Sequence, residues 1–342
     1  MSRAILRSNS GLLLGDHVSC DGFAYDRAVR VQTHIHFDHM IDFCRSKANQ
    51  TILVSAATRD LLIAIYNADL PYRENLKTLR DGQVYEVNGE EVEIFPSNHM
   101  LGSVQVRVTC EDGYRVGYSS DFFWPIDDPI EVDELVVDST YGDPLGTRRY
   151  DQAHVDEKLI DVVASNLRGG HPTALLGFNG RLQTALHLVA DFAQTPILCS
   201  PKAYPLVDVY RRHGFHLPHV IASNSPEGIS LVRKREPCLA IATLPERRHM
   251  PWIDRYRTVL LSGHVMRYAT DPVTWYGNGD CCVAMTDHAD FPGTVEYIKA
   301  TRARTVWTDP RSGNAHALAE AVRKRLGVEA AVIPEHKSLE WG

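Results

Sequence analysis

Short apolar runs bounded by turn residues recur through the first 142 or so residues of the chain. Their length and their content of β-branched residues are typical of strands, and a repeat of helical period interrupts them at residues 56–66. A second helix is expected directly after the histidines at residues 34–39. We therefore predict a strand-rich region, with strands at residues 29–32, 51–54, 91–95, 104–110 and 135–137.

From about residue 150 the pattern changes to an alternation of helical and strand-like segments. Such alternation is typical of a parallel sheet covered by helices. Helical repeats fall at residues 153–167, 182–192, 204–213, 293–300 and 315–326, and apolar strand-like runs fall at 173–177, 197–200, 258–262, 282–285 and 304–307. We predict one domain made of residues 1–145 and 256–342, with residues 146–255 inserted into it as a second domain.

The composition is that of a globular protein and carries no strong charge signal. Of 342 residues, 44% are hydrophobic and 23% are charged, which excludes disordered and fibrous classes. The formal net charge of −7 argues against an overall basic surface for nucleic acids, although a local basic groove is compatible with it. Composition does not indicate an oligomeric state.

The cysteines point to a reducing compartment. Seven are present, only Cys281 and Cys282 are adjacent, and no C-x-x-C pair occurs, so a disulfide framework is not expected. The first residues lack the long apolar core of a signal peptide, and no stretch reaches the roughly 18 apolar residues of a membrane span. We expect a cytoplasmic protein without a membrane partner.

Three histidines and an aspartate lie within six residues, directly after a predicted strand: His34, His36, Asp38 and His39. Imidazole nitrogens and carboxylate oxygens are the ligands that Zn²⁺ and similar ions prefer. Side chains alternate along an extended segment, so His34 and His36 are expected to point the same way. Asp38 and His39 would then reach a second ion. The alternative is a surface histidine cluster without a metal.

A site for two metal ions needs further ligands, and two later residues suit it. His99 lies in a turn between two strand-like runs, and Asp121 follows a strand directly. A carboxylate at the end of a strand is well placed to bridge two cations. Taken alone, each is compatible with an ordinary loop histidine or turn aspartate.

The order of these residues resembles the ordered motifs of the metallo-β-lactamase superfamily. The resemblance runs through the first 140 or so residues and implies an α/β fold, the αββα sandwich. It also implies two divalent ions, Zn²⁺ above all with Mn²⁺ or Mg²⁺ as alternatives, and a role for Asp21 in orienting the histidine loop without binding metal. The implied metal ligands are His34, His36, Asp38, His39, His99 and Asp121.

Three later segments resemble the β-CASP branch of this superfamily, whose members process nucleic acids. They are residues 136–142, residues 176–183 and residues 285–291. The resemblance implies that residues 146–255 are an inserted β-CASP α/β domain. It makes His288 the general acid, oriented by Asp138 or Asp290. It places Arg181 and Ser139 among the residues that bind substrate, and an arginine beside a helix N-terminus suits an anion.

Within that branch the chain looks most like bacterial ligase-associated DNA exonucleases, and it is also similar to Artemis-type and crosslink-repair nucleases. Residues 11–31 and 286–290 carry this likeness. RNA-processing members usually have a metal-binding histidine after the last strand, where residues 306–310 read Val-Trp-Thr-Asp-Pro. Either Asp309 replaces that histidine as a ligand, or the second ion is held more loosely. The difference disfavours RNA.

The predicted function is a two-metal phosphodiesterase acting on nucleic acid, with DNA favoured over RNA. We expect a DNA exonuclease in repair or processing, with Asp38, Asp138 and His288 as catalytic residues. One alternative is an RNA-processing nuclease of the same fold. Another is a hydrolase of small esters, lactams or thioesters, which would not need an inserted domain. A third is a metal-bound, non-catalytic subunit that works with a helicase or ligase partner.

Overall fold

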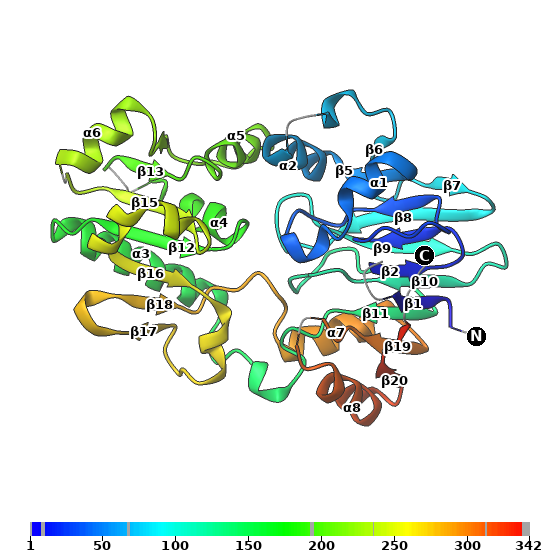
Figure 1. Ribbon diagram of the computed structural model, residues 1–342. Coiled ribbons are helices and arrows are strands. Elements are labelled where there is room, and N and C mark those ends of the chain that lie inside the picture. Colours follow the sequence, from blue (N-terminus) through cyan, green and yellow to red (C-terminus); the bar gives the residue numbers. More distant parts are fainter. Residues whose placement is uncertain are drawn as a thin grey trace. The chain divides into compact units, whose positions relative to one another are not determined.

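The computed structural model describes residues 2–7, 11–66, 69–191, 195–234, 236–311 and 313–336. It divides into two compact units, each with its own sheets and helices. The first unit combines Met1–Thr147 with His288–Gly342, and the second is Arg148–Asp287. The second unit is therefore inserted into the sequence of the first (Figure 1). Within the described residues, no helix is both long and apolar enough to cross a membrane.

Two sheets form the centre of the first unit (Figure 1). The first sheet has the order β21-β1-β2-β3-β4-β5-β6 and the second has the order β20-β19-β11-β10-β9-β8-β7. The strands of the first sheet are β1 (Ala4–Arg7), β2 (Gly11–Leu14), β3 (Val18–Cys20), β4 (Val29–Val31), β5 (Thr51–Ser55), β6 (Leu76–Leu79) and β21 (Glu335–His336). Those of the second are β7 (Tyr85–Val87), β8 (Glu90–Pro96), β9 (Val104–Thr109), β10 (Arg115–Tyr118), β11 (Glu134–Val137), β19 (Thr305–Thr308) and β20 (Glu329–Val332).

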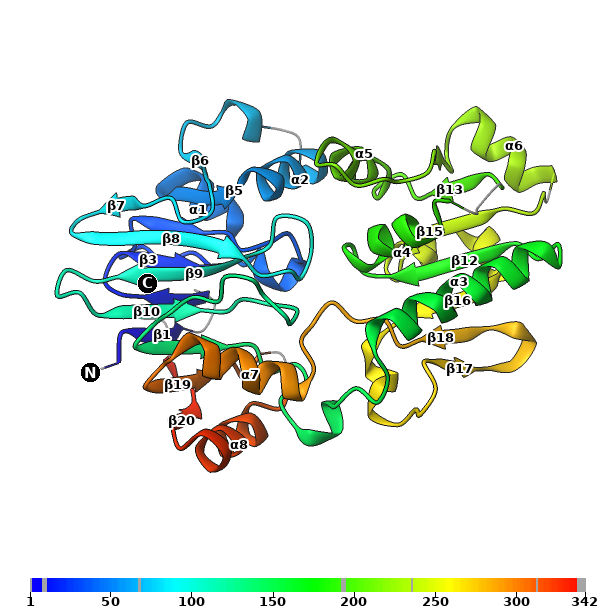
Figure 2. The same ribbon diagram turned by 180° about the vertical axis from the view of Figure 1, so that it is seen from behind.

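The sheets pack face to face because their strands alternate between apolar and polar positions. In β9, Val104, Val106 and Val108 face a shared core with residues of the first sheet such as Leu14 and Val31. The outer face of the second sheet is covered by α7 (Phe291–Thr301) and α8 (Ala315–Leu326), while α1 (Phe43–Asn49) and α2 (Ala56–Tyr66) contact β5. The layers therefore follow in the order helix, sheet, sheet, helix, and Figure 2 shows the same elements from behind. The predicted αββα sandwich is confirmed.

The second unit contains one mostly parallel sheet of order β14-β13-β15-β12-β16-β18-β17. Its strands are β12 (Thr173–Gly177), β13 (Ile197–Cys199), β14 (Ile221–Ala222), β15 (Leu239–Thr243), β16 (Arg257–Leu261), β17 (Val273–Trp275) and β18 (Cys281–Val283). Its α-helices are α3 (Gln152–Arg168), α4 (Arg181–Val189), α5 (Tyr204–Arg212) and α6 (Pro226–Lys234). The last residue of the helix predicted at 182–192 lies outside the described residues.

Short 3₁₀ helices occur in both units. They are η1 (Phe37–His39), η2 (Leu70–Tyr72), η3 (Pro144–Gly146), η4 (Glu246–His249), η5 (Pro251–Arg255), η6 (Gly263–Arg267) and η7 (Gly277–Gly279).

The insertion extends further along the chain than the predicted residue 255. β16 pairs in parallel with β12, with Thr173 opposite Arg257, and β18 pairs with β16. Both strands therefore belong to the sheet of the second unit, and the chain returns to the first unit at His288. The hydrophobic pattern of a segment predicts a strand but does not indicate which sheet the strand joins. The end of the insertion was therefore predicted too early in the sequence.

Candidate active site

The loop after β4 carries the histidine cluster. It leaves the strand in extended conformation, and His36 has φ −64° and ψ 148°. The 3₁₀ helix η1 then turns the chain at Asp38 and His39, and α1 begins only at Phe43. This geometry buries His34 and His39 in the first unit and leaves the carboxylate of Asp38 77% exposed.

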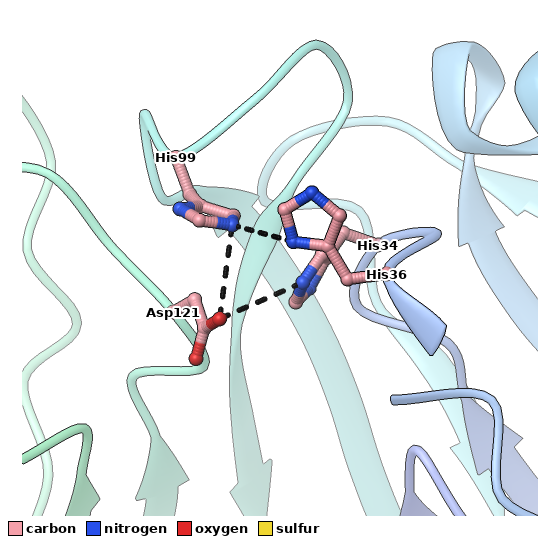
Figure 3. Close-up of side chains that lie close together, drawn as sticks. All are labelled: His34, His36, His99 and Asp121. Atoms are coloured by element: carbon pink, nitrogen blue, oxygen red, sulfur yellow. Dashed lines mark hydrogen bonds and ion pairs between the residues drawn. The ribbon is translucent and has the colours of Figure 1, made fainter. Parts of the chain in front are cut away.

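Figure 3 shows His34, His36, His99 and Asp121 converging from three loops of the first unit. Their nearest potential ligand atoms all lie within 4.8 Å of one another. Nδ1 of His36 is 3.0 Å from Nε2 of His99. Oδ2 of Asp121 is 3.7 Å from Nε2 of His34 and 3.7 Å from Nε2 of His99. Three imidazoles and a carboxylate thus surround one point.

His39 lies on another side of Asp121. Its Nε2 is 3.4 Å from Oδ2 of Asp121 and 3.8 Å from Oδ2 of Asp38. These three residues border a cavity of about 480 Å³. The complete lining is Phe37, Asp38, His39, Met40, Ile41, Asp42, Asp121, Asp309 and Arg311.

A single buried carboxylate, that of Asp21, orients two of the histidines. Its Oδ1 accepts the backbone N–H of Thr33 at 2.8 Å, and its Oδ2 accepts the Thr33 hydroxyl at 2.7 Å. Nδ1 of His39 lies 2.7 Å from the same Oδ2. Because the Thr33 hydroxyl donates to Asp21, it accepts from Nδ1 of His34 at 3.0 Å. In their neutral forms both rings therefore present an Nε2 lone pair.

The donor set fits a divalent cation. Nε2 of His34 is buried and has no hydrogen-bond partner among the described residues. Burial, together with the neighbouring imidazoles, holds the pKa of His34 well below its ordinary value, so this ring is neutral. Burial opposes ionisation of Asp121, but His39 and His288 outweigh it and hold the pKa of the Asp121 carboxyl well below its usual range. A neutral imidazole and an ionised carboxylate are the forms that bind metal.

His288 and Asp138 form a hydrogen-bonded pair beside this cluster. Nδ1 of His288 is 2.8 Å from Oδ2 of Asp138, while its Nε2 is 3.8 Å from Oδ2 of Asp121. Oδ1 of Asp138 accepts the backbone N–H and the hydroxyl of Thr140, at 2.9 and 2.8 Å. Asp290 instead caps α7, since it accepts the backbone N–H of Gly293 at 2.9 Å. Of the two predicted partners of His288, the structure places Asp138 against it.

Arg181 has a different environment from the predicted one. In the second unit its Nε is 2.9 Å from Oδ1 of Asp287, and both side chains are about nine-tenths buried. Its Nη1 donates to the backbone oxygen of Leu261 at 3.3 Å. The guanidinium is therefore paired with a carboxylate of its own unit. The sequence shows Arg181 beside a helix N-terminus, which suits an external anion. It does not show that Asp287 lies against Arg181 in the fold.

Ser139 and Asp309 also make contacts that the sequence did not predict. The Ser139 hydroxyl donates to the backbone oxygen of Asp309. The Asp309 carboxylate borders the cavity, but its two oxygens each accept from Nε of Arg311 at 3.0 Å. Among the described residues, the groups whose ligand atoms lie close enough together to hold a metal ion do not include Asp38, His39 or Asp309.

Sequence reasoning missed Arg30 and Gln32, which support the histidine loop from β4. Arg30 is fully buried and donates to the backbone oxygens of Ile41 at 2.7 Å and His39 at 3.0 Å. Gln32 donates to the backbone oxygens of His34 at 2.6 Å and His39 at 3.0 Å. The available signal was a charged residue in the middle of an otherwise apolar strand, since a buried charge needs compensating contacts.

Comparison with known proteins identifies relatives of this chain. No protein-family model matches it. A protein of Acidianus ambivalens described as an uncharacterized protein in the lig 3′ region is 30% identical over 131 residues, which are 37% of this chain and 92% of that protein. The chain belongs to the same family as this lig 3′-region protein.

Two further relatives match this chain over longer stretches. A probable DNA ligase of Opitutus terrae is 24% identical over 326 residues, covering 91% of this chain and 29% of the ligase. An RNase J-like protein of Methanocaldococcus jannaschii is 22% identical over 258 residues, covering 64% of this chain and 61% of that protein. The chain thus spans less than a third of the ligase and about three fifths of the RNase J-like protein.

A crystal structure of a protein of unknown function from Enterococcus faecalis V583 shares the fold at 15% identity. Its TM-score is 0.56, and the match covers 89% of this chain and 79% of that one. The αββα sandwich and the ordered histidine loop are those of the metallo-β-lactamase fold. The His/Asp cluster at this loop is consistent with binding of a divalent metal.

Proposed function

We propose that the chain is a metal-dependent nuclease of the β-CASP branch, which hydrolyses phosphodiester bonds in DNA as an exonuclease of repair or DNA processing. The observation that carries the proposal is the His288–Asp138 pair beside the cluster. Nε2 of His288 lies 3.8 Å from Oδ2 of Asp121, so a group that can transfer a proton borders the residues that can bind metal. Phosphodiester hydrolysis needs both functions, because the leaving oxygen must be protonated.

His34, His36, His99 and Asp121 would hold one ion, and Asp38, His39 and Asp121 would contribute to a second. Zn²⁺ suits the imidazole-rich set best, and Mn²⁺ or Mg²⁺ are the alternatives for the more exposed, oxygen-rich side. Bound ions would supply an activated water and neutralise the charge that develops on the phosphoryl oxygens.

The chain's own residues then have defined roles. Protonated at Nε2, His288 donates to the leaving oxygen, while Asp138 holds its Nδ1–H and so fixes the ring plane. Thr140 holds the Asp138 carboxylate in turn. Asp21 keeps the rings of His34 and His39 in the tautomer that leaves Nε2 unprotonated.

DNA is the substrate that the relatives favour. A probable DNA ligase and a protein of the lig 3′ region both match this chain, which also supports a ligase as a functional partner. The RNase J-like relative supports the second candidate, an RNA-processing nuclease with the same site. A non-catalytic metal-bound subunit is disfavoured, because an intact acid–base pair beside the cluster has no role in such a protein.

The test is a cleavage assay with end-labelled single- and double-stranded DNA and RNA, in Mn²⁺, Zn²⁺ or a chelator. We expect stepwise shortening of DNA that requires metal and disappears in Asp121→Ala. Asp254→Asn, a change to an exposed aspartate paired with Arg247 in the second unit, is the matched control and should cleave normally. Internal cuts would make the enzyme an endonuclease, and preferential RNA cleavage would favour the second candidate. Full activity in Asp121→Ala or in chelator would overturn the proposal.

A further inference from the structure

Arg311 borders the cavity that also contains Asp38, His39 and Asp121. We propose that Arg311 binds a phosphate group of the nucleic acid there, and that Asp309 positions its guanidinium and does not ligate a metal. The inference rests on the proposed nuclease function and names a substrate-binding residue within it. Its support comes from the contacts of the Asp309–Arg311 pair, all of which lie in the first unit.

The pair is held by several hydrogen bonds at once. Nε of Arg311 is 3.0 Å from each Asp309 oxygen, and Nη2 is 2.5 Å from Oδ2. The backbone N–H of Arg311 also donates to Oδ1 of Asp309 at 2.9 Å. Nη2 lies 3.1 Å from the hydroxyl of Tyr118, which is almost fully buried in the core. The guanidinium is therefore fixed on one side before any substrate arrives.

Asp309 is poorly available as a metal ligand for the same reason. Both of its oxygens already accept hydrogen bonds from Arg311, and its side chain is only 6% exposed. Turning the carboxylate toward an ion would leave a largely buried guanidinium without its counter-charge, which is costly. The backbone of Asp309 is also held in place. Its N–H donates to the backbone oxygen of Val137 at 3.0 Å, and its carbonyl oxygen accepts from the Ser139 hydroxyl.

Arg311 keeps donors for a ligand. A guanidinium has five N–H groups, and the contacts to Asp309 and Tyr118 use those on Nε and Nη2. The two on Nη1 have no hydrogen-bond partner among the described residues, and the side chain is 27% exposed where it borders the cavity. A planar donor group held in place by a carboxylate is the kind of cation that proteins use for phosphate.

The charges of the cavity make such a cation useful. Asp38, Asp42, Asp121 and Asp309 all line it, so a phosphodiester would be repelled unless positive charge balanced these carboxylates. Bound metal would offset the charges near His39. Arg311 offsets Asp309 and directs its remaining N–H groups to a non-bridging phosphate oxygen. The contact would fix the substrate backbone and carry no base specificity.

The experiment measures DNA binding and metal content in the same proteins. A fluorescein-labelled single-stranded DNA is titrated in a His288→Ala background, with the full chain loaded with Mn²⁺, by fluorescence anisotropy at several salt concentrations. We expect Arg311→Gln to weaken binding about tenfold or more, because it loses a charge-assisted hydrogen bond. The slope of log K against log salt should fall by about 0.7, the loss of one phosphate contact to a single strand. Ion content, measured by mass spectrometry, should not change.

Asp309→Asn separates positioning from metal binding. If Asp309 positions Arg311, Asp309→Asn should weaken DNA binding while the ion content stays at the wild-type value. If Asp309 ligates a metal, Asp309→Asn should lose an ion. The matched control is Arg107→Gln, because Arg107 is similarly exposed and similarly paired, with Glu93 at 2.8 Å, but lies away from the cavity. Arg311→Lys keeps the charge, so its DNA affinity should lie between those of the wild type and Arg311→Gln. It replaces Arg311→Gln in the test if that variant does not fold.

Two results would overturn the inference: wild-type DNA affinity in Arg311→Gln or Arg311→Lys, or loss of metal from Asp309→Asn. Neither would affect the proposed function if the wild-type protein still cleaves DNA. Absence of both cleavage and DNA binding in the wild-type protein would instead remove the proposed function and this inference together.

Discussion

Nδ1 of His39 and Oδ2 of Asp21 lie 2.7 Å apart, and Asp21 adopts the left-handed conformation with φ 60°. This contact predicts the effect of Asp21→Asn. Asparagine tolerates the same backbone conformation, so the loop should remain folded. Its amide nitrogen, however, would donate to Nδ1 of His39 and move the ring proton to Nε2, which removes the lone pair directed at Asp121.

We therefore expect the metal affinity of Asp21→Asn to fall about 10- to 100-fold, the usual effect of losing a carboxylate that orients a ligating histidine. Competition with a chelator, read by metal analysis, measures it. Asp26→Asn, which removes an exposed carboxylate paired with Arg7, is the control and should bind metal normally. Unchanged affinity in Asp21→Asn would show that the Asp21–His39 contact does not govern metal binding.

His288 and Asp138 allow two interpretations that one pair of variants can separate. With Asp121 they form a group able to hold a metal ion, and they also form the proposed acid pair. If His288 transfers a proton, His288→Ala should lower kcat about 10²- to 10⁴-fold while the ion content stays constant. Asp138→Asn should act in the same direction. If the amide oxygen keeps the hydrogen bonds from Thr140, the amide NH2 group faces Nδ1 of His288 and cannot accept the Nδ1–H of an imidazolium.

Mass spectrometry of the dialysed proteins and single-turnover kinetics provide the two readouts for the His288 variants. A lost ion in His288→Ala would make His288 a ligand. The pH profile adds a further check, since removing the acid should flatten the alkaline limb of kcat.

Much of the fold could be predicted because the relevant signals are local. The helix expected at residues 56–66 is α2, the one at 315–326 is α8, and the strands expected at 51–54 and 104–110 correspond to β5 and β9. These segments are periodic and bury one face. α6 (Pro226–Lys234) was missed because it is short and shallowly packed: it fully buries only Gly228, while Leu231 and Val232 are partly buried against the core.

The meeting of the candidate site residues was predictable where they lie close together in the sequence or match family motifs. His34 and His36 belong to the first kind, and His99 and Asp121 to the second. Arg311 and Arg30 could not be found this way, because their partners become neighbours only in the fold. Arg311 meets Tyr118 across 193 positions, and Arg30 meets Ile41 by means of a turn. The ion pair between Arg181 and Asp287 could not be predicted either, because the two residues lie far apart in the sequence, and the substrate-binding role of Arg181 stays a prediction.

The cysteines should differ sharply in reactivity. All seven are free thiols, and only Cys44 is exposed. Burial raises the pKa of Cys110 to about 11 and that of Cys281 to about 12, so these thiols hold almost no reactive thiolate near pH 8. We expect one fast equivalent with a thiol reagent such as dithionitrobenzoate, and the others only in denaturant. Cys44→Ser should remove the fast equivalent, and two or more fast equivalents in the native wild type would contradict the described packing.

Arg30 should matter more for stability than any exposed arginine. Its guanidinium donates to the backbone oxygens of Ile41 and His39 and to Oε1 of Gln32, at 2.6 to 3.0 Å. Arg30→Met keeps an apolar side chain of similar length but leaves the backbone oxygen of Ile41 and Oε1 of Gln32 unsatisfied, at about 1–3 kcal/mol each, while the backbone oxygen of His39 keeps its hydrogen bond from Gln32. We expect the free energy of unfolding to fall by about 3 kcal/mol or more, measured by urea denaturation of the metal-free protein.

The control for Arg30→Met is Arg59→Met, whose guanidinium lies 3.7 Å from Asp60 on the surface and should change stability by no more than about 0.5 kcal/mol. Because Arg30 holds the backbone oxygen of His39, its removal should also weaken metal binding even at temperatures where the protein stays folded. A variant that lost stability but bound metal normally would show that Gln32 and Asp21 position the loop without help from Arg30.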